Sequence, residues 1–252
     1  MRLPSIYSLL ILVLCTLALY NCSSTPTAVL PPSGAPPAIF KTYRPNGESV
    51  WNKGWVRSFD LTGVAFDKPQ TCTLITPRHA VMAKHYKRKI HSKVVFHDRK
   101  GIPHVRFIRS IEPCKGDVAV ALLDRPLPDG IATYALPNSA TPESNVIGRP
   151  IAVTDKRRGL YFHQVRSLSG LNLGMQFDPA QPHGTRKSLI SGDSGNPSFL
   201  VQNGQLILAE THLSGGAGSG PYYGNSEIQE SIRKAVAKLD SDYQIRTTLI
   251  NP

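Results

Sequence analysis

The chain has 252 residues, of which 40% are hydrophobic, and this is enough apolar material for one large domain or for two small lobes that share an interface. That content argues against disorder over most of the chain. The net charge of +12 favours contact with anionic polymers or surfaces and opposes self-association, so we expect a monomer, but the charge does not specify a fold.

Residues 1–22 have the pattern of an export signal. Arg2 supplies a positive start, and the apolar stretch YSLLILVLCTLALY is too short for a comfortable membrane span. Leu19 lies three residues before Cys22, which resembles the lipobox of bacterial lipoproteins, although Asn21 stands where that motif has a small residue. Two outcomes stay open. Cys22 is lipidated and tethers an exported chain to the cell envelope, facing the periplasm or the surface, or the chain is cleaved nearby and secreted.

Residues 23–39 are rich in Pro, Ser and small side chains, which predicts an extended, solvated tether. From residue 40 to residue 252 the chain consists of short apolar runs separated by Pro, Gly, Asn and Asp. The runs are CTLITP, KVVFH, DVAVALLD, NVIGRPIAV, LYFHQVRSL, PSFLVQ and QLILAETHL. Their length and their Val, Ile, Leu and aromatic content predict strands of a sandwich or barrel. No internal repeat is visible, which excludes solenoids and propellers.

Two local signals stand out near the C-terminus. In VQNGQLI, the pair Asn203-Gly204 separates two apolar runs and predicts a hairpin, because both residues tolerate positive φ. NSEIQESIRKAVAKLD predicts a helix with Asn225 or Ser226 as its N-cap. Its apolar face consists of Ile228, Ile232, Val236 and Leu239. We therefore expect an all-β body closed by a C-terminal helix.

The stretch LISGDSGNPSFL contains the strongest candidate nucleophile. Ser194 lies beside Gly195 and two residues after Gly192, and glycine lets the backbone turn sharply there. The N–H groups of Gly192 and Ser194 can then point into one small space and form an oxyanion hole. The alternative is a glycine-rich turn with a solvent-facing serine.

A serine nucleophile needs a base, and the base needs an orienting acid. In LITPRHAVMAKHY, two apolar runs separated by a turn at Pro77 lead to His85, one of eight histidines. In CKGDVAVALLD, Asp117 directly precedes a buried run, where a carboxylate is costly unless a group such as an imidazole pairs with it. Asp124 is the alternative acid, but the following Arg-Pro indicates a surface turn.

Together these motifs resemble the trypsin-like (chymotrypsin-fold) serine peptidases of the bacterial exported type. LITPRHAVMAKH is similar to their strand pair ending in Ala-Ala-His, DVAVALLD to their Asp-Ile-Ala-Leu strand, and SGDSGNP to their Gly-Asp-Ser-Gly-x-Pro motif. The order His85, Asp117, Ser194 differs from the orders in subtilisin-like and α/β-hydrolase enzymes. The resemblance implies two six-stranded antiparallel β-barrels with a C-terminal helix and an active site between the barrels.

The resemblance also implies roles and a substrate class. Ser194 would attack the scissile carbonyl of a protein or peptide, His85 would transfer the proton, and Asp117 would hold the imidazole. No cofactor and no metal are implied. Two rivals stay open. One is a serine esterase. The other is an inactive trypsin-fold module that binds partners or mediates adhesion in the envelope.

Several positions depart from the animal members of that family. Tyr86 stands where a cysteine usually follows the catalytic histidine, so the disulfide of that loop is absent. An exported chain can form a bridge between Cys72 and Cys114, or the two can be buried free thiols. No Ile-Val-Gly-Gly-like segment is present to pair with Asp193 after cleavage, so we expect Asp193 to pair locally.

The resemblance places the primary pocket at four positions. Ser188 would form the pocket floor, and its neutral side chain argues against a strict preference for Lys or Arg. Thr211, His212 and Leu213 would form the strand that pairs with the substrate backbone. A small or apolar preference and an acidic preference that uses His212 both stay open.

A basic segment, AKHYKRKIHSK, surrounds the candidate base. Its charges are Lys84, Lys87, Arg88, Lys89 and Lys93. Such a run is typical of a solvated loop, and the alternative is steering of anionic substrates or docking to anionic polymers. The sequence contains no recognised nucleic-acid-binding module, so we expect no nucleic-acid partner.

Overall fold

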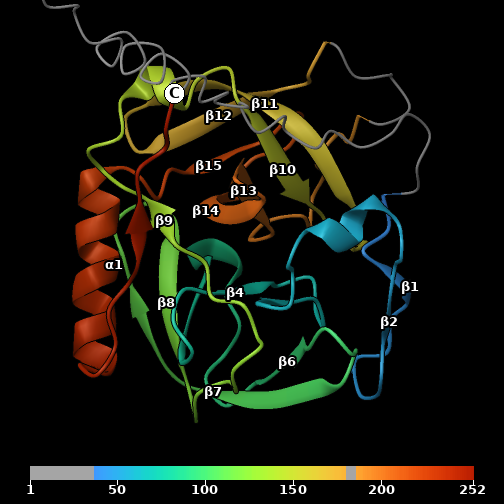
Figure 1. Ribbon diagram of the computed structural model, residues 1–252. Coiled ribbons are helices and arrows are strands. Elements are labelled where there is room, and N and C mark those ends of the chain that lie inside the picture. The colour runs from blue at the N-terminus through green and yellow to red at the C-terminus, as the bar shows by residue number, and fades with distance from the viewer. Residues whose placement is uncertain (1–36, 180–185) are drawn as a thin grey trace, which may run out of the picture.

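The computed structural model describes residues 37–179 and 186–252 (Figure 1). These residues form two six-stranded antiparallel sheets and a C-terminal helix, in agreement with the predicted two-barrel all-β fold. The predicted export signal, the lipobox at Cys22 and the first part of the tether lie outside the described residues.

The first sheet carries two of the candidate site residues near its strand ends. Its strands, in spatial order, are β3 (Val64–Ala65), β4 (Cys72–Leu74), β5 (His79–Ala83), β8 (Val118–Leu123), β7 (Pro103–Pro113) and β6 (Lys93–His97). Every residue of β5 and β8 is buried. Alternation along the strands explains this, because Ala80 and Met82 pack into a core of this sheet alone while Val81 faces a core shared with the second sheet.

The second sheet carries the candidate nucleophile on the segment that leads into β13. Its strands, in spatial order, are β14 (Gln205–Thr211), β13 (Pro197–Gln202), β10 (Pro150–Thr154), β11 (Leu160–Ser169), β12 (Asn172–Gln176) and β15 (Ser219–Pro221). Leu200 and Ile207 pack into a core of this sheet alone, whereas Phe199 and Leu208 face the shared core. Each sheet therefore has its own interior, and the shared core lies between them.

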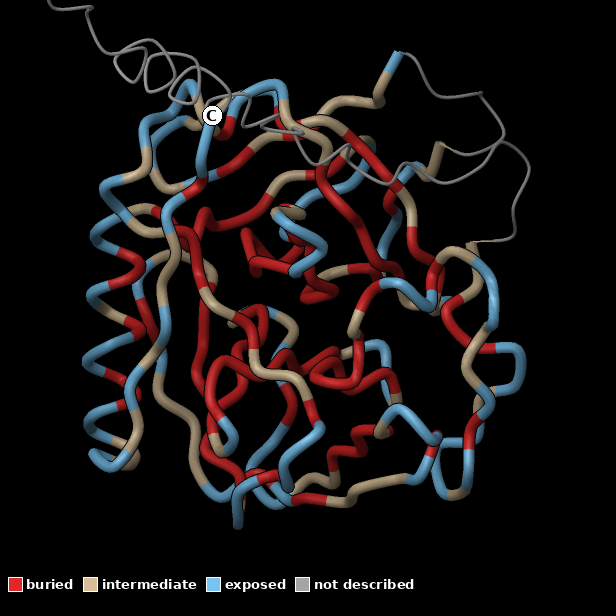
Figure 2. The backbone as a smooth tube through the Cα atoms, viewed as in Figure 1, coloured by how far each residue is buried: buried red, intermediate tan, exposed pale blue. Residues whose placement is uncertain are grey.

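Short elements complete the body. They are the antiparallel pair β1 (Phe40–Thr42) and β2 (Val50–Trp51), the parallel pair β9 (Leu136–Pro137) and β16 (Thr247–Thr248), and the 3₁₀ turns η2 (Trp55–Ser58), η3 (Lys84–Tyr86) and η4 (Glu143–Asn145). Helix α1 (Ser226–Leu239) lies beside β8 and presents one buried face to the body (Figures 1 and 2).

The two local predictions near the C-terminus are confirmed. Asn203 and Gly204 join β13 to β14 with φ of 53° and 73°, the pattern of a type I′ turn. Asn225 is the N-cap of α1, and its side chain accepts hydrogen bonds from two backbone N–H groups of the first helical turn. Ile228, Ile232 and Val236 are buried in the shared core, as their spacing predicted.

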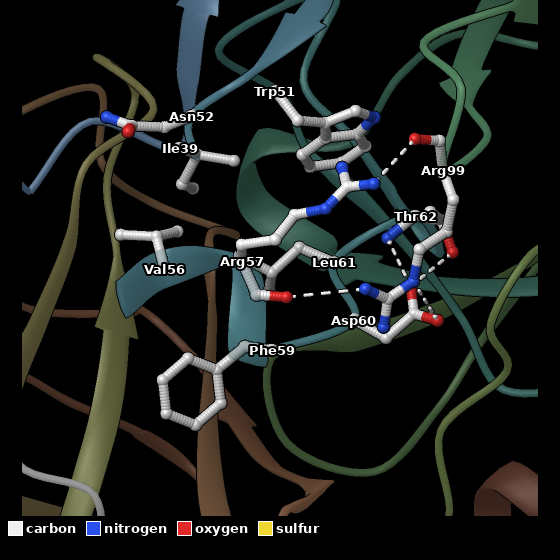
Figure 3. Close-up of a pocket in the computed structure, with 10 residues that line it drawn as sticks. All are labelled: Ile39, Trp51, Asn52, Val56, Arg57, Phe59, Asp60, Leu61, Thr62 and Arg99. Carbon is white, nitrogen blue, oxygen red and sulfur yellow. Dashed lines mark hydrogen bonds and ion pairs between the residues drawn. The ribbon is translucent and has the colours of Figure 1, made fainter. Parts of the chain in front are cut away.

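The packed body begins earlier than the predicted boundary at residue 40. Ile39 is fully buried, and its N–H donates to the carbonyl of Arg158 at 2.8 Å. Close by, Arg57 and Arg99 donate to each other's backbone carbonyls at 3.2 and 3.3 Å (Figure 3). The cavity at this point has a volume of about 10 Å³, at the limit for a single water molecule. Residues 37–39 are thus part of the fold, and the cavity beside them is a small packing defect.

Candidate active site

His85 sits on η3, directly after the buried strand β5. The N–H of Lys84 donates to the carbonyl of Asp117 at 3.2 Å, which continues the pairing of β5 with β8 by one residue. Beyond that bond the chain turns, and the His85 side chain is 43% exposed. The buried strand fixes the backbone while the imidazole stays accessible.

The carboxylate of Asp117 holds His85 at two points. Oδ1 accepts the backbone N–H of His85 at 2.9 Å, and Oδ2 lies 2.6 Å from its ring atom Nδ1. A carboxylate is an acceptor, so Nδ1 carries the hydrogen and a neutral ring keeps its lone pair on Nε2. The alternative acid, Asp124, instead accepts the backbone N–H of Phe107 at 2.9 Å. The structure therefore pairs His85 with Asp117 and not with Asp124.

Ser194 lies where two tight turns meet. The N–H of Asp193 donates to the carbonyl of Ile190 at 3.0 Å, and the N–H of Asn196 donates to the carbonyl of Asp193 at 3.1 Å. The third residue of each turn is a glycine with positive φ, 91° at Gly192 and 82° at Gly195. This is the type II pattern, which needs positive φ at that position and therefore favours glycine.

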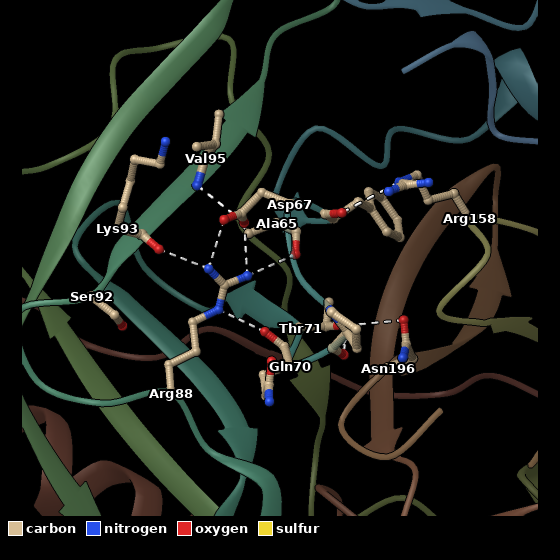
Figure 4. Close-up of polar contacts among 12 residues, drawn as sticks. Ala65, Asp67, Gln70, Thr71, Arg88, Ser92, Lys93, Val95, Arg158 and Asn196 are labelled. Carbon is tan, nitrogen blue, oxygen red and sulfur yellow. Dashed lines mark hydrogen bonds and ion pairs between the residues drawn. The ribbon is translucent and has the colours of Figure 1, made fainter. Parts of the chain in front are cut away.

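Contacts between the two sheets bring the serine turn to the end of β5. A Cβ added at Gly195 would lie 3.4 Å from the Cβ of Ala83, two residues before His85. The hydroxyl of Thr71 donates to the side-chain oxygen of Asn196 at 2.9 Å (Figure 4). In the described part of the chain, the Ser194 hydroxyl and Nε2 of His85 make no hydrogen bond. Such bonds are often long in unliganded sites and tighten when substrate binds.

The two predicted oxyanion donors are the backbone N–H groups of Gly192 and Ser194. Among residues 37–179 and 186–252, neither the N–H of Gly192 nor that of Ser194 donates to a protein acceptor. The carboxylate of Asp193 binds other donors: it accepts the N–H of Ile190 at 2.8 Å and the N–H of Lys156 at 3.2 Å. The expectation that Asp193 pairs locally is confirmed, and within the described residues the two backbone N–H groups have no protein acceptor.

The four predicted pocket residues differ in environment. Ser188 is exposed, and so is Leu213, at 41%. Thr211 is buried, and its hydroxyl hydrogen-bonds to the hydroxyl of Tyr223 at 2.8 Å. His212 is also buried, and its backbone binds the serine turn by accepting the N–H of Gly195 at 2.9 Å.

The ring of His212 has no free nitrogen. Nδ1 lies 2.8 Å from the carboxylate of Glu210, and Nε2 lies 2.9 Å from the carbonyl of Thr154. Burial opposes the charged imidazolium, but the Glu210 carboxylate outweighs it and raises the pKa of His212. A ring with both nitrogens occupied cannot recognise an acidic substrate without rearrangement. Glu210 was not predicted as a partner of His212, although a carboxylate inside the apolar run QLILAETHL was a signal in the sequence.

Cys72 and Cys114 are both buried free thiols, which is one of the two alternatives that the sequence left open. Cys72 packs in the core of the first sheet, whereas Sγ of Cys114 points toward α1 and lies 3.7 Å from the carbonyl of Ser231. Burial raises the pKa of both thiols to about 11, which makes them poor nucleophiles.

The basic segment after His85 is not uniformly solvated. Lys87 and Lys89 are exposed, but Arg88 is buried. The Arg88 guanidinium forms a two-pronged ion pair with the Asp67 carboxylate, with N–O distances of 2.7 and 2.8 Å (Figure 4). It also donates from Nε to the carbonyl of Gln70 at 2.6 Å. Arg88 thus anchors the segment that follows the candidate base.

In comparisons with known proteins, no family model matches the chain, and no curated protein matches it at a significant level of similarity. Within residues 37–179 and 186–252, no group of three or more His, Cys, Asp and Glu side chains is placed to hold a metal ion. No helix in those two ranges is long and apolar enough to cross a membrane.

Proposed function

We propose that this chain is a serine endopeptidase in which Ser194, His85 and Asp117 form a catalytic triad. The observation that carries the proposal is the double hold of Asp117 on His85, through the backbone N–H at 2.9 Å and through Nδ1 at 2.6 Å. This hold selects the tautomer with a basic Nε2, as a base that accepts a hydroxyl proton requires. If the Asp117 carboxylate had only a structural role before β8, nothing would require it to orient the exposed ring of His85.

The chemistry follows from these positions. As the Ser194 oxygen bonds to the scissile carbonyl carbon, its proton moves to Nε2 of His85, and negative charge develops on the carbonyl oxygen. The free N–H groups of Gly192 and Ser194 stabilise that charge. The carbon–nitrogen bond then breaks, the proton passes to the leaving amine, and an acyl-enzyme remains. Water hydrolyses the acyl-enzyme by the same proton transfers in reverse.

An uncharged residue before the cleaved bond fits the site best. Exposed apolar side chains flank the turn and the adjoining strand, Ile190 at 46% and Leu213 at 41%. Among the described residues, the carbonyl of Leu213 and the N–H of Gly215 make no hydrogen bond, so this edge can pair with an extended peptide. The occupied nitrogens of His212 argue against an acidic preference.

The test is covalent labelling of the full-length chain with a fluorophosphonate, followed by digestion of a mixed peptide library. Wild type should be labelled at Ser194, Ser194→Ala should not, and Ser139→Ala, which removes an exposed serine from another loop, should react like wild type. Cleavage after apolar residues would support the endopeptidase. Labelling with turnover of small esters but of no peptide would favour the esterase. A folded wild type that is not labelled would overturn the triad and favour the binding module.

A further inference from the structure

Lys156 contacts both sides of the turn that precedes Ser194. Its Nζ donates to the carbonyl of Ser191 at 2.5 Å, and its backbone N–H donates to the carboxylate of Asp193 at 3.2 Å. The side chain lies along the turn, because a Cβ added at Gly192 would meet Nζ at 3.1 Å and Cδ at 3.2 Å. Lys156 directly follows Asp155, beyond the end of β10, so a residue 35 positions away in sequence reaches this turn.

The contact with Ser191 determines where the Gly192 N–H points. Ser191 C=O and Gly192 N–H belong to one planar trans peptide, so they point in opposite directions. With the carbonyl held by Nζ, the N–H faces away from Lys156. Type I and type II turns differ by a flip of this central peptide, and glycine at 192 tolerates both. The turn itself therefore has little preference between the two orientations of the Ser191–Gly192 peptide. A contact from outside the turn can select one of them.

We propose that Lys156 is a positioning residue that fixes the Ser191–Gly192 peptide with its N–H available to the developing oxyanion. The inference rests on the proposed function and deepens it. A flipped peptide would present the Ser191 carbonyl in place of a donor, and the carbonyl would repel the negative charge of the transition state. Lys156 lies within the chain, so its contact with the turn does not depend on an N-terminal amino group released by cleavage.

The first test is structural and does not depend on activity. Crystal structures of wild type and of Lys156→Met would be compared at the Ser191–Gly192 peptide. The substitution keeps an unbranched stem and removes the ammonium. We expect the peptide to flip or to adopt both orientations in the variant. An unchanged single orientation would overturn the inference. Arg157→Met is the matched control, because it removes an exposed positive charge one residue away and should leave the turn as it is.

The second test separates positioning from general stability. Loss of one oxyanion donor costs about 10²- to 10³-fold in kcat, and a turn that still visits the correct orientation should lose less. We expect Lys156→Met to lower kcat about 10- to 100-fold with KM nearly unchanged, and a peptide boronate, which mimics the tetrahedral state, to bind weaker by the same factor. Lys156→Arg keeps the donor and should restore most of the rate.

The outcomes distinguish the two proposals. A wild-type chain that is folded but not labelled by fluorophosphonate would refute the proposed function, and the crystal structures would still decide the role of Lys156. A labelled wild type with an unchanged kcat in Lys156→Met would refute the positioning role alone. An equal loss in Lys156→Met and Arg157→Met would also refute it, because the effect would then follow from charge and not from the contact.

Discussion

The buried ion pair between Arg88 and Asp67 leads to a prediction about stability. The side chains of Arg88 and Asp67 are only 1% and 3% exposed. Besides the two carboxylate contacts, the guanidinium donates to the carbonyls of Gln70, Lys93 and Ala65 at 2.6, 2.9 and 3.5 Å. The Asp67 carboxylate also accepts the N–H of Val95 at 3.2 Å. These contacts tie β3, the loop before β4 and the start of β6 to the segment that follows η3.

The expected cost follows from the burial. Removing one partner of a buried ion pair costs about 3–5 kcal/mol, because the other charge is left without compensation. We expect Arg88→Met and Asp67→Asn each to lower the free energy of unfolding by about that amount. The double variant leaves no buried charge, so its cost should fall short of the sum of the single costs by about 2 kcal/mol. Lys87→Met, at the exposed neighbouring position, should change stability by no more than about 0.5 kcal/mol.

Urea unfolding of the four variants, followed by tryptophan fluorescence, measures these differences. A cost below about 1 kcal/mol for Arg88→Met would mean that the Asp67 carboxylate is not left as an uncompensated buried charge. Single costs that add to within about 0.5 kcal/mol would show that the two side chains are not energetically coupled. Either result would refute the argument that this ion pair anchors the segment that follows His85.

Three further predictions concern the site and its surroundings. Asp117→Asn should slow fluorophosphonate labelling by about 10⁴-fold, because the amide no longer enforces the tautomer with a basic Nε2; a rate within tenfold of wild type would contradict that role. Gly195→Ala should slow labelling strongly, since it strains a φ of 82° and adds a Cβ 3.4 Å from the last residue of β5. The control Gly204→Ala strains a φ of 73° in open space and should keep wild-type labelling. Burial lowers the pKa of His79 and of His163 to about 4, so between about pH 6.5 and 4 the unfolded chain binds more protons. The stability that these two neutral rings contribute should be fully present above that window and be lost as the pH drops through it, and equal urea midpoints at pH 7 and pH 4.5 would refute this.

Local rules predicted the elements whose causes are local. Asn203-Gly204 specified its hairpin because both residues tolerate positive φ. Asn225 specified the start of α1 because its side chain caps the first turn. Asp117 was recognised from the cost of a carboxylate before a buried strand, and its partner His85 accounts for that position.

The sequence was ambiguous or misleading where contacts between distant residues determine the environment of a side chain. The sequence left open whether Cys72 and Cys114 form a bridge, because a sequence without known register does not give strand faces; in the structure one thiol faces the core of the first sheet and the other faces α1. Arg88 looked solvated within a run of charges, yet its partner Asp67 lies 21 residues upstream. Lys156 carried no signal, because the Ser191 carbonyl that it holds belongs to another segment.

The candidate site therefore depends on two kinds of contact, those within the first sheet and those between the two sheets. His85 and Asp117 are joined within the first sheet, through the pairing of β5 with β8, so their geometry survives as long as that sheet is folded. Ser194 lies on the segment that leads into β13 of the second sheet, and contacts such as that between Thr71 and Asn196, which are 125 residues apart, bring this segment to the first sheet. The shared core packs the two sheets against each other. Substitutions there should abolish labelling of Ser194 while the imidazole–carboxylate pair stays intact, because packing, and not the motifs, brings the three residues together.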